Sequence, residues 1–248
     1  MEKFNVEGIV IKTSVTGESD KILWILTRNR GIIRAFAKGA RGTKSRLHSG
    51  ASLFAFCDFA VYEKNDVFHI NEAQVKEIFF ELRTSIENLT LAQYFCEVLL
   101  KTLPENVVSD EYMRLLLNCL YFLCKETKPA LLIKSVFELR IASLAGYMPS
   151  LVACDNCGEF ESDEMYFNCE NGMLFCATCG KNADAPVFPL PVITAMRHIV
   201  FSSFEKIFSF SLSDELLVKL NIITQKYLEN CFQQKFRLLD YFDNVRQN

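Results

Sequence analysis

The chain has 248 residues, of which 50% are hydrophobic and 23% charged, enough for one or two domains with a substantial core. With only 10 Gly and 6 Pro, it is neither collagen-like nor largely disordered. The mean hydropathy of +0.12 reflects 22 scattered Phe, since no apolar run reaches the ~20 residues of a membrane-spanning helix. The N-terminus also lacks the apolar block of a secretion signal. We therefore expect a cytoplasmic protein without membrane association.

The net charge of −3 is unevenly distributed. Residues 1–80 hold 12 Lys and Arg against 9 Asp and Glu, whereas residues 81–248 hold 15 against 21. No acidic residue lies between Asp20 and Asp58, and composition alone would place about four or five there. This stretch suits a polyanionic partner. Its basic residues are Lys21, Arg28, Arg30, Arg34, Lys38, Arg41, Lys44 and Arg46.

Residues 4–80 have the pattern of a small β-barrel. Five short stretches of strand-like sequence are joined mostly by tight turns, which favours a barrel over a sandwich. They cover residues 4–13, 20–28, 31–38, 53–63 and 67–72. The one long connection, Gly39–Gly50, is expected to be a mobile basic loop. We therefore predict an OB-fold, nucleic-acid-binding domain over residues 1–80.

From Ser85 the apolar period becomes helical. Helices are expected over residues 85–103, 109–124 and 129–146, from near Pro191, from Ser213 and over residues 236–244. We therefore predict an α+β protein, in which an N-terminal OB-fold β-barrel precedes a helical domain over residues 81–248. That domain carries a zinc ribbon insertion at about residues 150–182.

The ribbon is predicted from four of the ten cysteines. Cys154, Cys157, Cys176 and Cys179 form a C-x2-C-x18-C-x2-C pattern, and each pair is followed by Gly. Thiolates at this spacing can complete a tetrahedral shell around one Zn²⁺ ion, which would be structural because no coordination position stays open. The alternative is a pair of redox C-x-x-C motifs. Cys169 is a possible substitute ligand, although it lies in the expected hairpin.

Aromatic residues and the basic loop are candidates for nucleic-acid contacts. Aromatic faces stack on bases while cations neutralise phosphates. The barrel candidates for stacking are Trp24, Phe36, Phe54, Phe56 and Phe68, most of which could equally form the core. The loop from Lys38 to Arg46 is the stronger candidate, with an ordinary solvated loop as the alternative.

No sequence pattern indicates an enzyme. The nearest approach to a phosphate-binding loop, Gly39 to Ser45, fails because Lys44 does not directly follow the second Gly at the required spacing. The three His residues are widely separated, and no nucleophile or dinucleotide motif is present. We therefore expect a protein without catalytic residues or a nucleotide cofactor.

Three groups of residues occur in a recognisable order along the chain. Glu7–Lys12 with Gly17–Asp20 forms an opening strand and turn, Ala37–Arg46 forms a basic loop, and Phe137–Arg140 with Gly146–Pro149 precedes the zinc ribbon. In this combination the chain resembles the RecO family of bacterial recombination mediators. The resemblance covers nearly the whole chain.

The resemblance implies a DNA repair and recombination protein located in the bacterial cytoplasm with the nucleoid. Such a protein binds single- and double-stranded DNA and anneals complementary strands. With RecR, it loads recombinase onto DNA coated by single-strand-binding protein, whose acidic C-terminal tail it also binds. Carried onto this chain, the DNA contacts are Lys38, Arg41, Lys44 and Arg46, with Arg34 and Arg28 as weaker candidates.

Lys134, Arg140 and Tyr147 are candidates for the tail-binding site, because an acidic tail with an aromatic end needs a cation beside an apolar hollow. The alternative is that both cations lie on the solvated face of an amphipathic helix. Two other functions compete with the mediator: a zinc-ribbon protein-interaction adaptor without annealing activity, and a thiol oxidoreductase.

Overall fold

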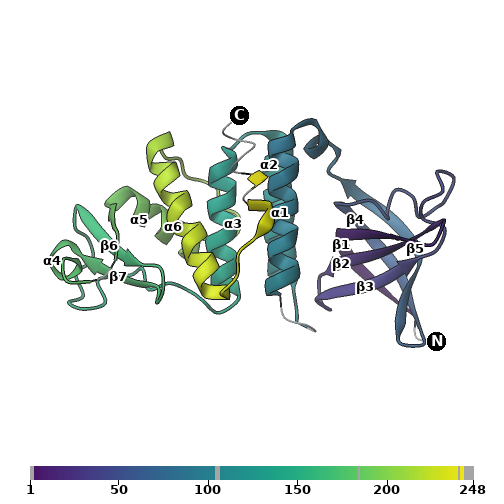
Figure 1. Cartoon of the computed structure of the whole chain (residues 1–248), viewed down its shortest axis with the longest axis horizontal. Coiled ribbons are helices and arrows are strands. Elements are labelled where there is room, and N and C mark those ends of the chain that lie inside the picture. The colour runs from purple at the N-terminus through teal and green to yellow at the C-terminus, as the bar shows by residue number, and fades with distance from the viewer. Residues whose placement is uncertain (1–2, 104–106, 184, 240, 243–248) are drawn as a thin grey trace. The chain divides into compact units, whose positions relative to one another are not determined.

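The computed structural model describes residues 3–103, 107–183, 185–239 and 241–242. These residues form two compact units (Figure 1). Unit 1 consists of the described residues before Lys125 together with those after Arg237, and unit 2 is Lys125–Arg237.

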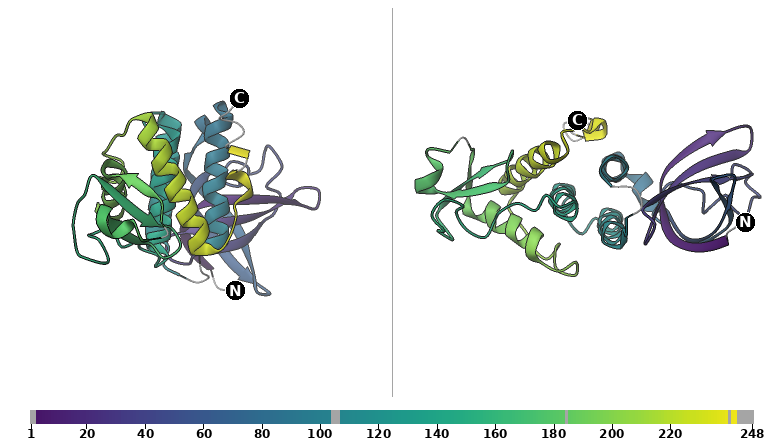
Figure 2. Two further views of the ribbon diagram at one scale, coloured as in Figure 1. Left: turned by 60° about the vertical axis from the view of Figure 1, so that its left-hand side comes forward. Right: turned by 90° about the horizontal axis from the view of Figure 1, so that it is seen from below.

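Unit 1 begins with the predicted β-barrel. Its strands are β1 (Lys3–Thr16), β2 (Asp20–Thr27), β3 (Ile32–Ala37), β4 (Ala55–Lys64) and β5 (Val67–Ile78). They close in the order β1-β2-β3-β5-β4, with every pair antiparallel except β3 and β5. The right-hand view of Figure 2 shows these strands curving into a ring. The predicted closed barrel of five strands is therefore present.

The barrel encloses an apolar core because alternate residues of each strand point inward. Leu23 and Ile25 of β2 are fully buried there. The connection between β3 and β4 contributes Ala40, Leu47 and Ala51 to the same core. The expectation of a mobile loop therefore needs correction, because its few apolar residues anchor it to the barrel.

Three helical elements complete most of unit 1: η1 (Phe80–Thr84), α1 (Ile86–Thr102) and α2 (Asp110–Lys125). The Ser85 hydroxyl caps α1 by accepting a hydrogen bond from the Asn88 amide. The Ser109 hydroxyl, just before α2, donates to the Thr27 carbonyl oxygen at 2.5 Å. This contact ties the start of α2 to the barrel. The compact unit that begins with the barrel extends to Cys124.

Unit 2 combines helices with a small three-stranded sheet. Its elements are α3 (Ala130–Leu144), β6 (Glu164–Asn168), β7 (Met173–Cys176), α4 (Ala177–Gly180), β8 (Val187–Pro189), α5 (Leu190–Phe201) and α6 (Asp214–Phe232). The sheet order is β7-β6-β8. The predicted hairpin is formed by β6 and β7, and β8 extends the sheet beyond the residue-182 limit of the predicted ribbon.

The last predicted helix, residues 236–244, lies partly outside the described residues. Residues 237–239 and 241–242 are helical. No helix in the described part of the chain is long and apolar enough to cross a membrane.

Candidate nucleic-acid interface and metal centre

The basic loop is fixed against the turn between β1 and β2. The Gly39 amide donates to Asp20 Oδ1 at 2.7 Å, and the Arg41 amide donates to the Ser19 carbonyl oxygen at 3.0 Å. Arg41 Nη1 also donates to the Glu18 carbonyl oxygen at 2.6 Å. Two segments that are separate in the sequence, the turn and the loop, therefore form one structural feature.

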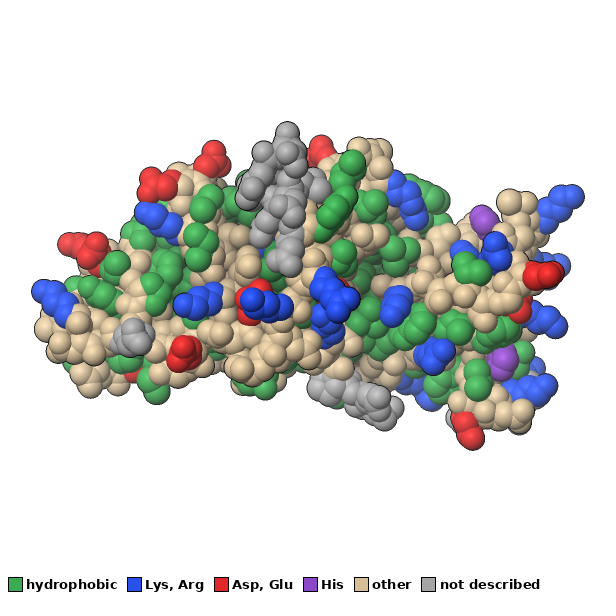
Figure 3. Space-filling model, viewed as in Figure 1, with side chains coloured by type: hydrophobic (Ala, Val, Ile, Leu, Met, Phe, Trp, Pro, Cys, Tyr) green, Lys and Arg blue, Asp and Glu red, His purple; other side chains and the backbone are tan. Residues whose placement is uncertain are grey.

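This feature concentrates positive charge. The side chains of Lys38, Lys44 and Arg46 are exposed and form no ion pair with any residue that the structure describes. Burial and the neighbouring positive charge of Arg41 lower the pKa of the partly buried Lys21. Figure 3 shows Lys and Arg side chains on the part of the surface that the barrel forms. An anion near this loop would therefore relieve repulsion between like charges.

The two weaker DNA-binding candidates differ from each other. Arg34 is exposed, and its guanidinium lies 5.4 Å from the centre of the Trp24 ring. Arg28 is bonded to Glu7 at 2.6 Å and also to Asp110, and hydrogen bonding to Glu7 raises its pKa. The charge of Arg28 is therefore paired with carboxylates of unit 1, unlike that of Lys38, Lys44 or Arg46.

The barrel separates the stacking candidates into two groups. Phe54 is buried at the end of the loop, and Phe68 packs against the core. Trp24 and Phe36 are partly exposed, and each lies between two inward-facing residues of its strand. Phe56 is also partly exposed, with Lys76 Nζ 5.6 Å from its ring centre.

Lys12, a further cation beside Trp24, was not among the candidates predicted from the sequence. Its ammonium lies 4.7 Å from the Trp24 ring centre, on the side of β2 opposite β3. A bulge between Val10 and Lys12 shifts the alternation of β1 at this point, so the strand pattern alone does not assign Lys12 to a face.

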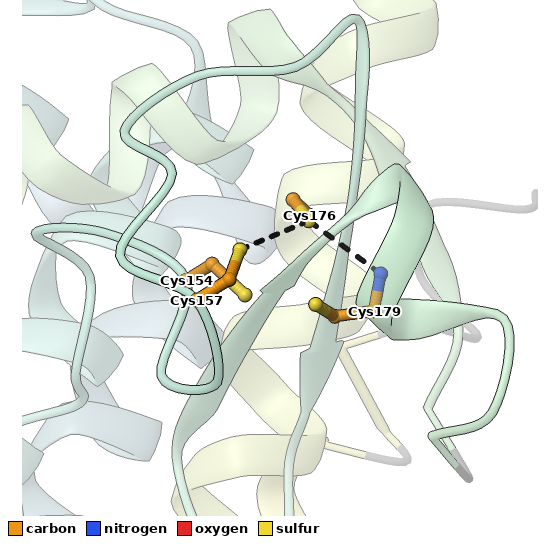
Figure 4. A group of neighbouring side chains, drawn as sticks. All are labelled: Cys154, Cys157, Cys176 and Cys179. Atoms are coloured by element: carbon orange, nitrogen blue, oxygen red, sulfur yellow. Dashed lines mark hydrogen bonds between the residues drawn. The ribbon is translucent and has the colours of Figure 1, made fainter.

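The four predicted ligands gather in unit 2. The sulfur atoms of Cys154, Cys157, Cys176 and Cys179 all lie within 4.8 Å of one another (Figure 4). Those of Cys157 and Cys176 are 3.7 Å apart. Four thiolates at ~2.3 Å from one ion are separated by ~3.8 Å, so the donor set fits a tetrahedral metal. Cys169 lies outside the cluster, and its thiol faces the Ile223 carbonyl oxygen at 4.0 Å.

Local backbone geometry explains why each Cys pair is followed by Gly. Gly158 has a φ of +78°, a left-handed conformation that side chains disfavour. At Gly180 a Cβ atom would lie 2.1 Å from the Tyr166 ring, so α4 can approach β6 only without a side chain there. Asp155 fixes the first pair to β7 by accepting the Leu174 amide at 2.7 Å.

Backbone amides make the cluster suitable for thiolates. The Cys179 amide donates to Cys176 Sγ at 3.5 Å. At Cys154, burial opposes ionisation, yet backbone hydrogen bonds from Cys176, Cys157 and Asn156 lower the pKa to about 6. Hydrogen bonds among the side chains of the cluster help to raise the pKa values of Cys157, Cys176 and Cys179, so Cys154 is the thiol that ionises most readily, and the thiolate is the form that binds a metal ion.

The predicted tail-binding residues do not form one surface. Lys134 is fully buried, 2.7 Å from the equally buried Glu138 on the same helix. Its ammonium also donates to Asn221 Oδ1 at 3.4 Å and to Gln225 Oε1 at 3.2 Å, both on α6. The structure therefore corrects the expectation for Lys134, because both the tail pocket and the solvated face required an exposed ammonium.

The other two residues of this group have separate environments. Arg140 Nη1 donates to the Val200 carbonyl oxygen at 2.6 Å, near the end of α5, and its guanidinium lies 4.9 Å from the Phe204 ring centre. Tyr147 is exposed and makes an edge contact with Phe232.

The chain thus combines a five-stranded β-barrel that carries a cationic loop with a helical region that carries four clustered cysteines, an α+β class of protein. The family descriptions "Recombination protein O N terminal" and "Recombination protein O C terminal" match residues 1–79 and 83–240. The chain is 33% identical to the DNA repair protein RecO of Acetivibrio thermocellus over 246 residues, which cover 99% of this chain and 98% of the relative.

Two further relatives carry the same description. The DNA repair protein RecO of Alkaliphilus metalliredigens is 30% identical, over 90% of this chain and 91% of its own. That of Caldicellulosiruptor bescii is 29% identical, over 98% of each chain. The chain belongs to the RecO family of DNA repair proteins.

Proposed function

We propose that this chain is a DNA-binding recombination mediator without catalytic activity. It binds single- and double-stranded DNA through the barrel, anneals complementary strands and works with RecR to load recombinase onto single strands coated by single-strand-binding protein. The observation that carries the proposal is the acid-free segment between Asp20 and Asp58, which displays Lys38, Lys44 and Arg46 without ion-pair partners among the described residues.

The chemistry of annealing supports a mediator that needs no reacting group. Two complementary strands repel each other through their phosphates, and a cationic surface that screens this repulsion raises the rate of encounter. Arg41 supports the role by holding the loop to the β1–β2 turn while its guanidinium stays at the surface. The OB-fold assignment of the barrel accords with this role, since OB-folds are common platforms for single strands.

We also propose that the four cysteines bind one structural Zn²⁺ ion. Thiolate ligands and tetrahedral spacing suit zinc, and four protein ligands leave no position for a substrate. Bound zinc would join the Cys154 and Cys176 pairs and so fix the segment that precedes α5. The family resemblance adds RecR and the acidic tail of single-strand-binding protein as partners, with Lys134 no longer a contact.

The test is annealing of two complementary strands by the purified protein, without nucleotide, over a series of salt concentrations. We expect annealing that fades with salt. The variant Lys38→Ala/Lys44→Ala/Arg46→Ala should lower the slope of log affinity for single strands against log salt by about 2, at ~0.7 per lost phosphate contact.

The matched control removes three exposed cations from unit 2, in Lys181→Ala/Lys206→Ala/Lys226→Ala. This control has the same net charge as the loop variant, and it should keep the salt slope of the unmodified protein. Equal slopes in the two variants would show that total charge, and not the loop, governs DNA binding.

The adaptor is the second candidate, and one surface of unit 2 favours it. A hollow beside α5 is lined by the exposed side chains of Val152, Phe160 and Phe201. Folded, zinc-loaded protein that neither anneals nor binds DNA would favour the adaptor over the mediator. A protein with reactive thiols and no bound metal would instead support the oxidoreductase.

A further inference from the structure

The outer face of the barrel carries a row of two cations around one tryptophan. Lys12 of β1 pairs with Trp24 of β2, and Trp24 pairs with Arg34 of β3. Both cations lie over the indole, at 4.7 Å and 5.4 Å from its ring centre. The neighbours of Trp24 along the strand, Leu23 and Ile25, point into the core, so the indole faces outward.

A second row of aromatic rings lies one pleat further along the same face. Phe36 of β3 pairs with His69 of β5, which in turn pairs with Tyr62 of β4. The His69 ring stacks on Tyr62 with centres 5.1 Å apart and an interplanar angle of 11°. Phe36 meets His69 edge-on at 5.5 Å. All three side chains are partly exposed.

The two rows are neighbours because β3 contributes to both, with Arg34 in the first row and Phe36 two residues, or ~7 Å, further along the strand. Ile22 of β2 lies opposite Phe36 and two residues from Trp24. Trp24, Phe36, His69 and Tyr62 therefore lie on one outer face of the barrel, across β2, β3, β5 and β4. We call this set of four aromatic side chains the outer aromatic track.

The chemistry of this track differs from that of the basic loop. Cations bind the phosphates of any nucleic acid, whereas aromatic faces stack on bases that are not already paired and stacked. In a duplex the base faces are covered by neighbouring base pairs. A base that stacks on the indole takes the place of Lys12 or Arg34 over the ring, and the displaced cation can then contact a neighbouring phosphate.

We propose that the outer aromatic track binds unpaired bases of single-stranded nucleic acid. This inference rests on the proposed DNA-binding function and adds to it the ligand of a second site. The loop binds the backbone of either form, and the track adds affinity for single strands alone. Annealing pairs these bases, so the duplex product no longer binds to the track.

The full-length protein contains its own reporter, because Trp24 is the one Trp of the chain. Three fluorescein-labelled probes are used: an oligothymidylate, an abasic oligonucleotide of equal length and a duplex. Anisotropy of the label measures binding, and Trp24 emission measures stacking. Oligothymidylate should quench the emission, whereas the abasic strand and the duplex should bind with little quenching.

The variant Phe36→Leu keeps an apolar side chain at the position and removes the ring. It should weaken oligothymidylate binding by roughly fivefold or more, the effect of losing one stacked base, and leave abasic binding unchanged. Phe36→Trp should restore the affinity. The control is Tyr121→Leu, which removes an exposed ring from α2 and should change neither.

The outcomes separate the two proposals. Equal quenching by abasic and normal strands, or equal loss of both affinities in Phe36→Leu, would overturn the aromatic track and leave DNA binding by the loop intact. Absence of an anisotropy change with every probe would overturn the DNA-binding function, and the track with it. Addition of the complementary strand should reverse the quenching, and quenching that persists in the duplex would contradict the track.

Discussion

The barrel and unit 2 use polar side chains in opposite ways. In the barrel the core is apolar, and Lys38, Lys44 and Arg46 lie outside without ion-pair partners among the described residues. In unit 2 an ion pair, Lys134 with Glu138, lies fully buried between α3 and α6. The four-cysteine cluster is a second polar site in the same unit.

The difference indicates which polar residues should affect DNA binding and which should affect stability. Exposed cations contribute little to folding, because water screens them in the folded and the unfolded chain alike. A buried charge must keep its partner or cost several kcal/mol. Substitutions of polar residues should therefore affect DNA affinity in the barrel and the free energy of unfolding in unit 2.

The largest effect on stability is expected at the metal centre. Cys154→Ser or Cys176→Ser should lose the metal and unfold the segment around β6 and β7, since a structural zinc site contributes on the order of 10 kcal/mol of binding free energy. Metal content by mass spectrometry and hydrogen exchange of each unit measure the result. The barrel should keep its protection.

The control for the metal centre is Cys124→Ser, which changes a cysteine outside the cluster and should retain one equivalent of metal. Removal of zinc by a chelator should reproduce the exchange pattern of Cys154→Ser. A Cys154→Ser protein that still holds a full equivalent of zinc would show that these thiols are not the ligands.

The next effect is expected at the buried ion pair. Lys134→Met removes the ion-pair partner of the buried Glu138 carboxylate, which also accepts a hydrogen bond from Thr224 at 2.8 Å, and should lower the free energy of unfolding by about 3–5 kcal/mol. Denaturation with urea measures it. Lys134→Met/Glu138→Leu removes both charges and should recover most of the loss. A double variant as unstable as the single one would assign the effect to packing.

A smaller effect is expected at Glu7 in the barrel. Burial opposes ionisation of its carboxyl, but hydrogen bonds from Lys76 and Arg28 outweigh it and hold the pKa below 4.5. Because the folded pKa is lowered, this stabilisation is present above about pH 4.5 and is lost as the pH falls through the folded value.

Glu7→Gln should therefore cost ~1 kcal/mol near neutral pH, and the cost should shrink in acid. Urea unfolding of both proteins over a pH series measures the difference. A cost that stays constant down to about pH 3 would mean that the carboxylate charge does not contribute to stability.

The smallest effect on stability is expected in the basic loop. Lys38→Ala/Lys44→Ala/Arg46→Ala should change the free energy of unfolding by less than ~0.5 kcal/mol, or raise it slightly by removing repulsion, although it weakens DNA binding. Thermal melting and DNA titration on one preparation provide both values. A large loss of stability would show that the loop cations support the fold, and would contradict the proposed difference between the two units.

Features that depend on the spacing of residues close together in the chain were predictable from the sequence alone. Two residues between cysteines place both thiols of a pair within reach of one ion, and an apolar period of two or of 3.6 residues distinguishes strand from helix. The cysteine cluster, the five barrel strands and the helices α1, α2, α3, α5 and α6 were therefore predictable. The acid-free segment was also visible, because charge is a property of composition.

Whether a charged or aromatic side chain is available to bind a ligand depended on the tertiary structure. In the sequence, Lys134 has the neighbours of a surface cation. In the folded chain, α6 places Asn221, which lies 87 residues later, beside its ammonium. Arg28 is neutralised by Asp110, 82 residues away. Trp24 and Phe54 are both aromatic residues of one domain, yet Trp24 faces outward from β2, whereas Phe54, in the connection before β4, is buried. Burial and pairing arise from contacts between distant segments, and local sequence patterns do not specify those contacts.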